Sequence, residues 1–255
     1  MRELFSLAGQ VALVTGASGG LGAHFAQVLA TAGATVAVAA RRDDWVAAVV
    51  SEIVSTGGRA LAVSLDVTNP ESVAGAFDVT EQDAGLVTVV VNNAGIVDGE
   101  RALDVSESEW DRVIDTNLKG AWMVAQEAAR RMIAANIGGS IVNIASILGF
   151  RVSGRIAPYA ISKAGVVQMT KALALEWSRY NIRVNALAPG YVETDINREF
   201  LKSDAGAKLI RRIPQRRIGR PEDLDGSLLL LASGASGYMT GSIIPVDGGH
   251  LVSSL

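Results

Sequence analysis

The sequence predicts an α/β chain built on one doubly wound parallel sheet of about seven strands, with helices on both faces. Two observations lead to this prediction. Short runs rich in β-branched residues alternate along the chain with segments of helical periodicity. These runs are nearly continuous in apolar residues, which is typical of strands buried on both faces of a parallel sheet. No linker, low-complexity tract or internal repeat interrupts the alternation, so residues 1–255 are expected to form a single domain.

The strand pattern occurs in seven segments, expected at residues 10–16, 35–40, 60–66, 87–93, 140–146, 182–190 and 242–249. The first helix is expected at residues 20–32, where Leu21, Phe25, Val28 and Leu29 share one face. Gly33 fits the position just after the end of this helix, because glycine adopts the left-handed conformation that terminates helices.

Further helices are indicated by their start signals. A second helix is expected to begin near Trp45, and a capping-box pattern of Ser106 and Glu109 opens a long amphipathic segment. An apolar helix is expected at residues 224–233. The only long segment without a strand is 191–220, which is rich in arginine and is interpreted as a substrate lid or a peripheral helix pair.

Composition excludes several classes of protein. The chain has 49% hydrophobic residues and a formal net charge of -3, so nothing points to binding of nucleic acid or of an anionic membrane surface. It has no cysteine, and its two histidines lie at opposite ends of the chain, so no metal site is expected. No apolar run approaches the length of a membrane span, and a cytoplasmic location is expected.

A glycine-rich loop follows the first expected strand and opens the first helix. In "VTGASGGLG", the residues Gly16, Gly20 and Gly22 give the spacing G-x-x-x-G-x-G. Glycines at such a turn let backbone N–H groups approach a pyrophosphate at the positive end of a helix. The alternative is an ordinary glycine-rich turn, but the strand before it and the helix after it favour a dinucleotide site.

The end of the second strand bears on which dinucleotide is bound. A carboxylate there would bind the adenosine ribose 2′-OH, whereas an arginine accommodates a 2′-phosphate. The sequence has Ala40 followed by Arg41 and Arg42, so NADP(H) is favoured over NAD(H). Asp43 and Asp44 keep NAD(H) open, although acidic residues also suit the N-terminus of the next helix.

One further acidic residue, Asp66, ends the third expected strand. It is placed to hydrogen-bond the adenine amino group. It could also cap the helix that follows, and the two roles are compatible.

A set of motifs further along the chain resembles the short-chain dehydrogenase/reductase family, in its 3-oxoacyl reductase-like or glucose dehydrogenase-like branch. The matching pieces are "TGASGGLG" (15–22), "NNAG" (92–95), Asn117 in "DTNLKG", Ser146 in "NIAS", "YAISK" (159–163) and "PGYVET" (189–194). The resemblance covers nearly the whole chain. It implies a Rossmann fold and a nicotinamide-dependent interconversion of a ketone and an alcohol.

The same resemblance implies a catalytic set of four residues: Asn117, Ser146, Tyr159 and Lys163. Tyr159 and Lys163 are four positions apart and therefore project from one face of a helix. We expect the Lys163 ammonium to lower the pKa of the Tyr159 phenol, which would then donate or accept the proton. By resemblance, Ser146 holds the carbonyl oxygen, Lys163 also binds the nicotinamide ribose, and Asn117 helps to hold a water.

Each of these four residues has a plainer alternative. Tyr159 could be a surface aromatic, Ser146 a cap at a strand end, Asn117 a mid-helix kink and Lys163 a solvated charge. Their joint occurrence in this order beside a dinucleotide loop favours the catalytic interpretation.

The cofactor-binding residues are expected in the glycine loop, at the ends of the second to fourth strands, in the catalytic helix and in the segment that lines the nicotinamide. The "NNAG" segment is expected to shape a strand end rather than to take part in chemistry. The full set is Gly16, Ser18, Gly20, Leu21, Gly22, Arg41, Arg42, Asp66, Val67, Asn93, Ala94, Gly95, Tyr159, Lys163, Pro189, Gly190, Val192 and Thr194.

The substrate is a small ketone or alcohol whose identity the sequence leaves open. Leu148 and Phe150 are expected as apolar walls, and basic side chains follow at Arg151, Arg155 and within 198–220. One hypothesis is that this basic cluster receives an anionic acyl carrier, which would make the protein a 3-oxoacyl thioester reductase. The alternatives are that the arginines face water or a second subunit, and that the substrate is a polyol, a sugar or a hydrophobic alcohol.

Two further alternatives concern catalysis and assembly. A dinucleotide-binding protein without turnover remains a remote alternative, which would predict damage to the catalytic set. By resemblance, a homotetramer or a homodimer is expected.

Overall fold

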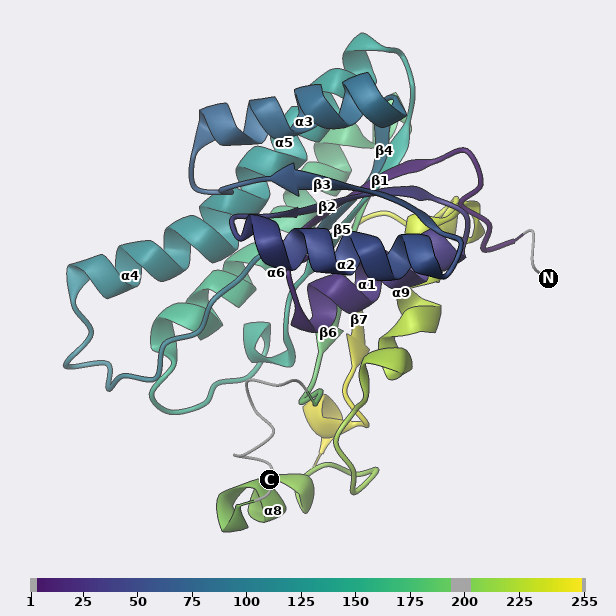
Figure 1. Ribbon diagram of the computed structural model, residues 1–255. Helices are drawn as coiled ribbons and strands as arrows, with labels where there is room; N and C mark the ends of the chain where they lie inside the picture. Colours follow the sequence, from purple (N-terminus) through teal and green to yellow (C-terminus); the bar gives the residue numbers. More distant parts are fainter. Residues whose placement is uncertain (1–3, 194–202, 254–255) are drawn as a thin grey trace.

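Seven parallel strands form a single sheet in the order β3-β2-β1-β4-β5-β6-β7 (Figure 1). The computed structural model describes residues 4–193 and 203–253. The strands are β1 Val11–Thr15, β2 Thr35–Ala40, β3 Arg59–Ser64, β4 Val87–Asn92, β5 Gly139–Ile144, β6 Ile182–Pro189 and β7 Ile243–Val246. The strand order reverses between β1 and β4, and ligands of such sheets bind at the carboxyl ends of the strands beside that reversal.

Helices cover both faces of the sheet, as predicted. Two apolar cores result: α3, α5 and α6 pack on one face, and α1, α2 and α9 pack on the other (Figure 1). The helices are α1 Gly20–Thr31, α2 Asp43–Ser55, α3 Pro70–Ala84, α4 Glu107–Ile114, α5 Gly120–Ala134, α6 Ala157–Trp177, α8 Asp204–Ile210 and α9 Asp225–Ala232.

Short helical turns join these elements. A π-helical turn lies at Asp115–Lys119, and 3₁₀ turns lie at Ile147–Gly149, Ser178–Tyr180, Pro221–Leu224, Gly234–Ser236 and His250–Val252.

The β1 sequence shows how one strand serves both cores. Successive side chains of a strand point to opposite faces, so Leu13 joins the core under α3, α5 and α6, while Ala12 and Val14 join the other core. All three side chains are fully buried. An apolar residue at every position is therefore what a central parallel strand requires.

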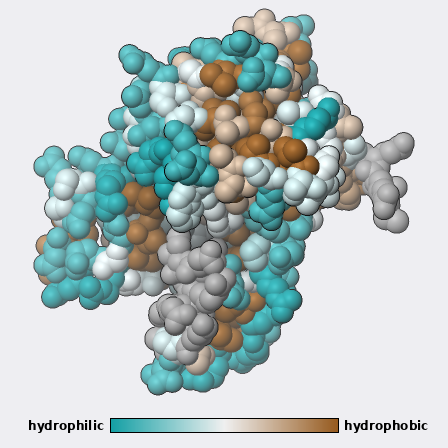
Figure 2. All heavy atoms as spheres, in the orientation of Figure 1, coloured by the Kyte–Doolittle hydropathy of each residue, from teal (hydrophilic) through white to brown (hydrophobic). Residues whose placement is uncertain are grey.

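Burial on both faces was wrong for the two edge strands. The β3 residues Arg59 and Ser64 are exposed, and no residue of β7 is fully buried. An edge strand has a neighbouring strand on one side only, so its residues are less completely covered. Figure 2 shows hydrophobic surface between α2 and α3, over β3, and the exposed Val54 and Val79 lie on those two helices.

The helix starts follow the local capping chemistry. The Ser106 hydroxyl accepts the Glu109 N–H and the Glu109 carboxylate accepts the Ser106 N–H, which confirms the capping box. The segment it opens continues as helical backbone from Glu107 to Ala134, with the π turn lying between α4 and α5. The α3 cap is Asn69, whose carboxamide oxygen accepts two backbone N–H groups, so the suggestion that Asp66 caps this helix was wrong.

Candidate active site

Three side chains of the predicted catalytic set meet at the carboxyl end of β5. Ser146 follows that strand, and Tyr159 and Lys163 lie in the first two turns of α6. Pro158 occupies the first turn of α6, where its missing N–H costs no hydrogen bond, and the helix begins at Ala157, two residues before Tyr159. The four-residue spacing then places both side chains on the same face of the helix.

Tyr159 makes a hydrogen bond with Ser146, and its phenol is largely withdrawn from solvent. Burial raises the pKa of Tyr159 above its ordinary value of 10.0, the Ser146 hydrogen bond acts in the opposite direction, and Tyr191 raises the pKa further. The prediction that the Tyr159 pKa is lowered was therefore wrong for the protein without bound cofactor. The desolvation of the phenol is larger than the stabilisation of phenolate.

Lys163 is buried beneath the tyrosine. Its Nζ donates a hydrogen bond to the carbonyl oxygen of Ile144 at 2.7 Å and lies 5.6 Å from the centroid of the Tyr159 ring. Burial lowers the pKa of Lys163 from 10.5 to about 8. The ammonium is thus charged at neutral pH, yet it can release its proton far more readily than a lysine in water.

Asn117 lies at the centre of the π turn and is 1% exposed. Its Oδ1 accepts the Ile96 N–H at 2.8 Å, and its Nδ2 donates to the Ile96 carbonyl at 2.8 Å and to Ser162 Oγ at 3.1 Å. Asn117 thereby fixes the loop after β4 against α6. Gly95 lies between Asn117 and Lys163. A Cβ added to Gly95 would lie 3.4 Å from Asn117 Oδ1 and 3.6 Å from Lys163 Nζ.

The glycine loop packs closely against the loop after β4. Gly16 has a φ of +65°, and a Cβ on Gly22 would lie only 2.4 Å from the Gly16 carbonyl oxygen. Asn93 Nδ2 donates to the carbonyls of Thr15 and Gly16 at 3.0 and 3.2 Å. The "NNAG" segment therefore braces the glycine loop, a contact that the sequence did not predict.

The first turn of α1 is available to a ligand. Gly20 opens this helix, Leu21 is half-buried, and no side chain caps the N-terminal N–H groups within the described part of the chain. Uncapped N–H groups at a helix N-terminus beside close-packed glycines suit a pyrophosphate. The loop is thus consistent with a bound dinucleotide.

Arg42 connects the end of β2 with the glycine loop. Its Nη2 donates to Ser18 Oγ at 2.9 Å, and its guanidinium lies 4.3 Å from the centre of the Trp45 ring. Arg41 is exposed beside it. These two contacts hold the Arg42 guanidinium in a defined position before any ligand arrives.

Two more residues predicted to bind the cofactor, Asp66 and Val67, follow the carboxyl end of β3. Asp66 accepts the Thr68 N–H and hydroxyl at 2.9 and 2.7 Å. The Thr68 backbone hydrogen bond is the main reason that the Asp66 pKa is lowered, and Arg41 contributes to the same effect. Val67 is buried beneath Gly120. After the end of β4, the Ala94 N–H donates to Thr15 Oγ1 at 3.0 Å.

The residues predicted to line the nicotinamide lie at the end of β6 and in the segment after it. Pro189 ends the strand, and a Cβ on Gly190 would lie 2.7 Å from Asp247 Cβ, so glycine is required by this close approach. Val192 is buried and forms a bridge with Gly219. Thr194 lies outside the described residues.

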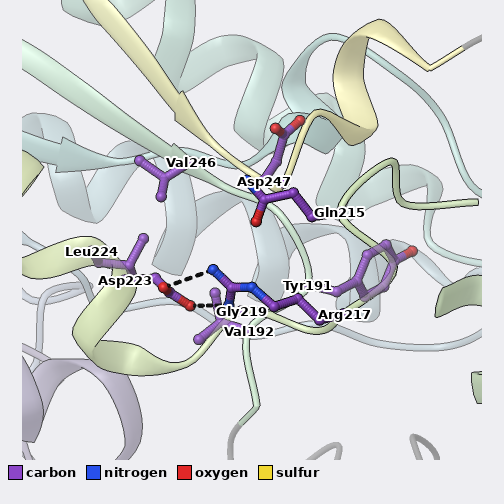
Figure 3. A pocket seen from close by; sticks show the side chains of 10 residues that line it. Tyr191, Val192, Gln215, Arg217, Gly219, Asp223, Leu224, Val246 and Asp247 are labelled. Carbon is purple, nitrogen blue, oxygen red and sulfur yellow. Dashed lines mark hydrogen bonds and ion pairs between the residues drawn. The ribbon is translucent and has the colours of Figure 1, made fainter.

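A pocket of about 220 Å³ lies between this segment and the 3₁₀ turn Pro221–Leu224 (Figure 3). Arg217 and Asp223 form a bidentate ion pair across it, with nitrogen–oxygen distances of 2.6 and 2.9 Å. The pocket is lined by Tyr191, Val192, Gln215, Arg217, Gly219, Asp223, Leu224, Val246, Asp247 and Gly248. Ser146, Tyr159 and Lys163 are not among its lining, so it borders the reacting groups without containing them.

Three features of the site were not predicted. Tyr191 follows the Pro-Gly pair and comes close enough to Tyr159 to affect its pKa. Ser162 links Asn117 to the Tyr159 carbonyl, and the Ile144 carbonyl accepts from Lys163. An aromatic directly after Pro-Gly was a usable signal for Tyr191, whereas the other two contacts depend on folded geometry alone.

Residues 4–193 and 203–253 contain neither a metal site nor a membrane-spanning helix. No group of three potential side-chain ligands could hold a metal ion in this part of the chain. Within the same ranges, every helix is too short or too polar to traverse a bilayer.

The fold and the glycine loop are those of a dinucleotide-dependent oxidoreductase, and Ser146, Tyr159 and Lys163 lie together in it. A family model described as enoyl-(acyl carrier protein) reductase matches residues 16–250. The chain belongs to the short-chain dehydrogenase/reductase family of enzymes, which act on CH–OH groups.

Named relatives cover almost the whole chain. It is 39% identical to the 2-dehydro-3-deoxy-D-gluconate 5-dehydrogenase of Escherichia coli (strain K12) over 249 residues, which cover 97% of each chain. It is 38% identical over 246 residues to the 3-oxoacyl-[acyl-carrier-protein] reductase of Thermotoga maritima, covering 96% of this chain and 99% of the relative.

Solved structures give the same result. A short-chain type dehydrogenase/reductase from Mycobacterium marinum is 44% identical with a TM-score of 0.93, covering 97% of this chain and 98% of that one. The gluconate 5-dehydrogenase from Burkholderia cenocepacia J2315, in complex with NADP and tartrate, is 35% identical with a TM-score of 0.94 and 99% coverage of both chains.

Proposed function

We propose that this enzyme interconverts a ketone and a secondary alcohol with NADP(H), and that Tyr159 is the proton donor and acceptor. The observation that carries the proposal is the contact of Tyr159 with Ser146 above the buried ammonium of Lys163. A phenol, a hydroxyl and an ammonium at the carboxyl ends of the central strands are suited to stabilise a developing alkoxide.

The proton chemistry follows from the pKa shifts. Bound NADPH would supply the hydride to the carbonyl carbon. Because burial raises the pKa of Tyr159, the phenol stays protonated at neutral pH and is ready to donate in the direction of reduction. Ser146, already bonded to Tyr159, would hold the same carbonyl oxygen. Lys163, with a pKa lowered to about 8, would return a proton to the phenolate after turnover.

The NADP(H) preference rests on Arg42. Its contacts with Ser18 and Trp45 place a guanidinium at the end of β2, where the 2′-phosphate of the adenosine ribose would lie. The exposed Arg41 adds a second positive charge. The B. cenocepacia relative, solved with NADP, supports the same choice, and NAD(H) remains the alternative cofactor.

The proposal is tested by mixing the enzyme with NADPH or NADH and a panel of ketones, then following the absorbance of the reduced nicotinamide. We expect oxidation of NADPH with at least one ketone and a lower kcat/KM with NADH. The reverse reaction with the matching alcohol and NADP should also proceed. Absence of turnover with every ketone and alcohol, despite cofactor binding, would favour a non-catalytic dinucleotide-binding protein.

A second candidate substrate is a 3-oxoacyl thioester. It is supported by the T. maritima relative and by the exposed arginines Arg211, Arg212, Arg216 and Arg220. Arg217 contributes less to this basic cluster, because Asp223 already neutralises it. Acetoacetyl-CoA in the same assay distinguishes this candidate, which requires a preference for the thioester over simple ketones.

A further inference from the structure

The loop after Ser146 meets the C-terminal turn at Arg151. Arg151 Nη1 donates to the His250 carbonyl oxygen at 2.5 Å and to Ser253 Oγ at 3.1 Å. The side chain is half-buried, and its Nε and Nη2 have no hydrogen-bond partner among residues 4–193 and 203–253. A half-buried guanidinium with two unused donor nitrogens is well suited to a carboxylate, which accepts two parallel hydrogen bonds.

Tyr191 connects Arg151 with the reacting groups. Its ring lies 5.7 Å from the His250 ring, and its hydroxyl is hydrogen-bonded to Ser153, two residues beyond Arg151. The same phenol comes close enough to Tyr159 to raise the pKa of Tyr159. Figure 3 shows the Tyr191 ring pointing away from the Arg217–Asp223 pair. Arg151, His250 and Tyr191 thus form one continuous wall beside the catalytic tyrosine.

This wall has an excess of positive charge. The His250 pKa is lowered first by burial and then by Arg151, and Arg212 acts in the same direction. Asp247 opposes them, but its two carboxylate oxygens accept backbone N–H groups of the C-terminal turn at 2.8 and 2.6 Å. His250 Nδ1 is buried without a hydrogen-bond partner in the described residues, so protonation of this ring beside Arg151 would be unfavourable. No carboxylate of the described residues pairs with Arg151.

We propose that Arg151 binds a carboxylate of the substrate while the reacting carbonyl lies against Ser146 and Tyr159, so that the physiological substrate is a keto acid or the matching hydroxy acid. This inference rests on the proposed function and narrows its substrate class. Tyr191 supplies a second, neutral donor in the same wall, because burial raises its pKa and keeps the phenol protonated. A thioester lacks a carboxylate at this position and would leave the guanidinium unpaired.

The test compares each keto acid with its own amide, because the pair differs in charge and hardly in shape. We would measure kcat and KM with NADPH for acetoacetate against acetoacetamide and for 5-keto-D-gluconate against its amide. The expected kcat/KM of the acid exceeds that of its amide by about 10- to 100-fold in at least one pair, the range of one charge-assisted bidentate contact. Arg151→Gln should reduce this ratio to near one through KM, and Arg151→Lys should retain part of it.

Two control variants separate recognition from structure. Ser253→Ala removes one contact of Arg151 without changing its charge, and Arg59→Gln removes an arginine that binds the Gly33 carbonyl on the distant edge of the sheet. Both should keep the preference for the acid. Loss of that preference in Ser253→Ala would show that Arg151 merely anchors the C-terminal turn.

Calorimetric binding of acetoacetate and 5-keto-D-gluconate to the NADPH-loaded protein gives the same comparison without turnover. Equal binding of acid and amide by the natural enzyme, or an unchanged ratio in Arg151→Gln, would overturn the inference while ketone reduction still stood. If no ketone is turned over, the proposed function fails instead, and the binding ratio alone decides whether Arg151 recognises carboxylates.

Discussion

At the scale of single residues, the site is governed by burial more than by proximity of charges. The Tyr159–Lys163 spacing suggested that the ammonium acidifies the phenol, whereas the folded protein raises the pKa of the tyrosine and lowers that of the lysine. Both shifts have desolvation as their first cause. The proton therefore resides on Tyr159 at neutral pH, which favours the direction of reduction.

We expect the buried charge of Lys163 to lower the free energy of unfolding of the protein at neutral pH. Its pKa is about 8 in the folded protein against 10.5 ordinarily, so the unfolded chain binds more protons between these two pH values. Stability then rises as pH increases through this window. We expect Lys163→Met to abolish turnover and to stabilise the protein at pH 7 by roughly 2 kcal/mol, the charging cost less one lost hydrogen bond.

Urea unfolding of the natural protein and of this variant at pH 7 and at pH 10.5 measures the effect. The advantage of Lys163→Met should shrink at the higher pH, where Lys163 is already neutral in the folded protein and is losing its charge in the unfolded chain. A variant that is less stable than the natural protein at pH 7 would contradict the burial account.

We expect Arg42 to bind the 2′-phosphate of NADPH. Arg42→Ala removes the guanidinium that Ser18 and Trp45 hold in place, and we expect KM for NADPH to rise about 10- to 100-fold with little change for NADH. Steady-state kinetics with both cofactors measure this, and Arg41→Asp should shift the preference further toward NADH. Equal losses with NADPH and NADH would mean that Arg42 supports the glycine loop rather than the phosphate.

At the scale of elements, the strands were predictable and the local irregularities were not. Six of the seven strands lie within two residues of their expected positions and β7 ends three residues early, because buried parallel strands have a stronger apolar signal than this edge strand. The π turn around Asn117 has no local signal in "DTNLKG", since an extra residue per turn is stabilised by tertiary contacts with Ile96 and Ser162. Such turns often mark functional sites.

The close approach of α1 to the glycine loop gives a prediction for Gly22. A Cβ at this position would lie 2.4 Å from the Gly16 carbonyl and 2.5 Å from Asn93 Nδ2, so Gly22→Ala must push the loops apart. We expect a loss of about 1–3 kcal/mol of stability and weaker dinucleotide binding. Thermal unfolding and NADPH titration measure the two effects.

Gly75→Ala is the matched control for this substitution. Gly75 lies inside α3, and an added Cβ would meet nothing within 4 Å. Its replacement should be neutral or should stabilise the protein by up to about 1 kcal/mol. If the two variants behave alike, the packing of Gly22 is looser than the structure indicates.

At the scale of the whole molecule, the meeting of Ser146, Tyr159 and Lys163 was predictable because these residues lie in short motifs. The wall of Arg151, Tyr191 and His250 was not, because its members are 40 to 99 residues apart in sequence and meet only through the order of β5, β6 and β7. The proposed carboxylate site would be assembled from these distant segments, which is why the sequence left the substrate open.

Assembly is a further prediction at this scale. Trp110, Trp122 and Leu175 lie on α4, α5 and α6 and are 39%, 40% and 82% exposed. We propose that these helices pair between subunits of a homotetramer, since large exposed apolar side chains commonly mark interfaces. Light scattering should give four times the mass of one chain, and a monomer at micromolar concentration would contradict this.

The role of Tyr159 as proton donor is tested by comparing Tyr159→Phe with the natural enzyme, measuring both ketone reduction and NADPH affinity. The substitution removes one hydroxyl from a side chain that contacts Ser146 and lies above Lys163. We expect kcat to fall by at least about 100-fold, the usual contribution of a general acid, while NADPH binds with nearly unchanged affinity. Substantial reduction by Tyr159→Phe would show that another group supplies the proton, and the account of this site would be wrong.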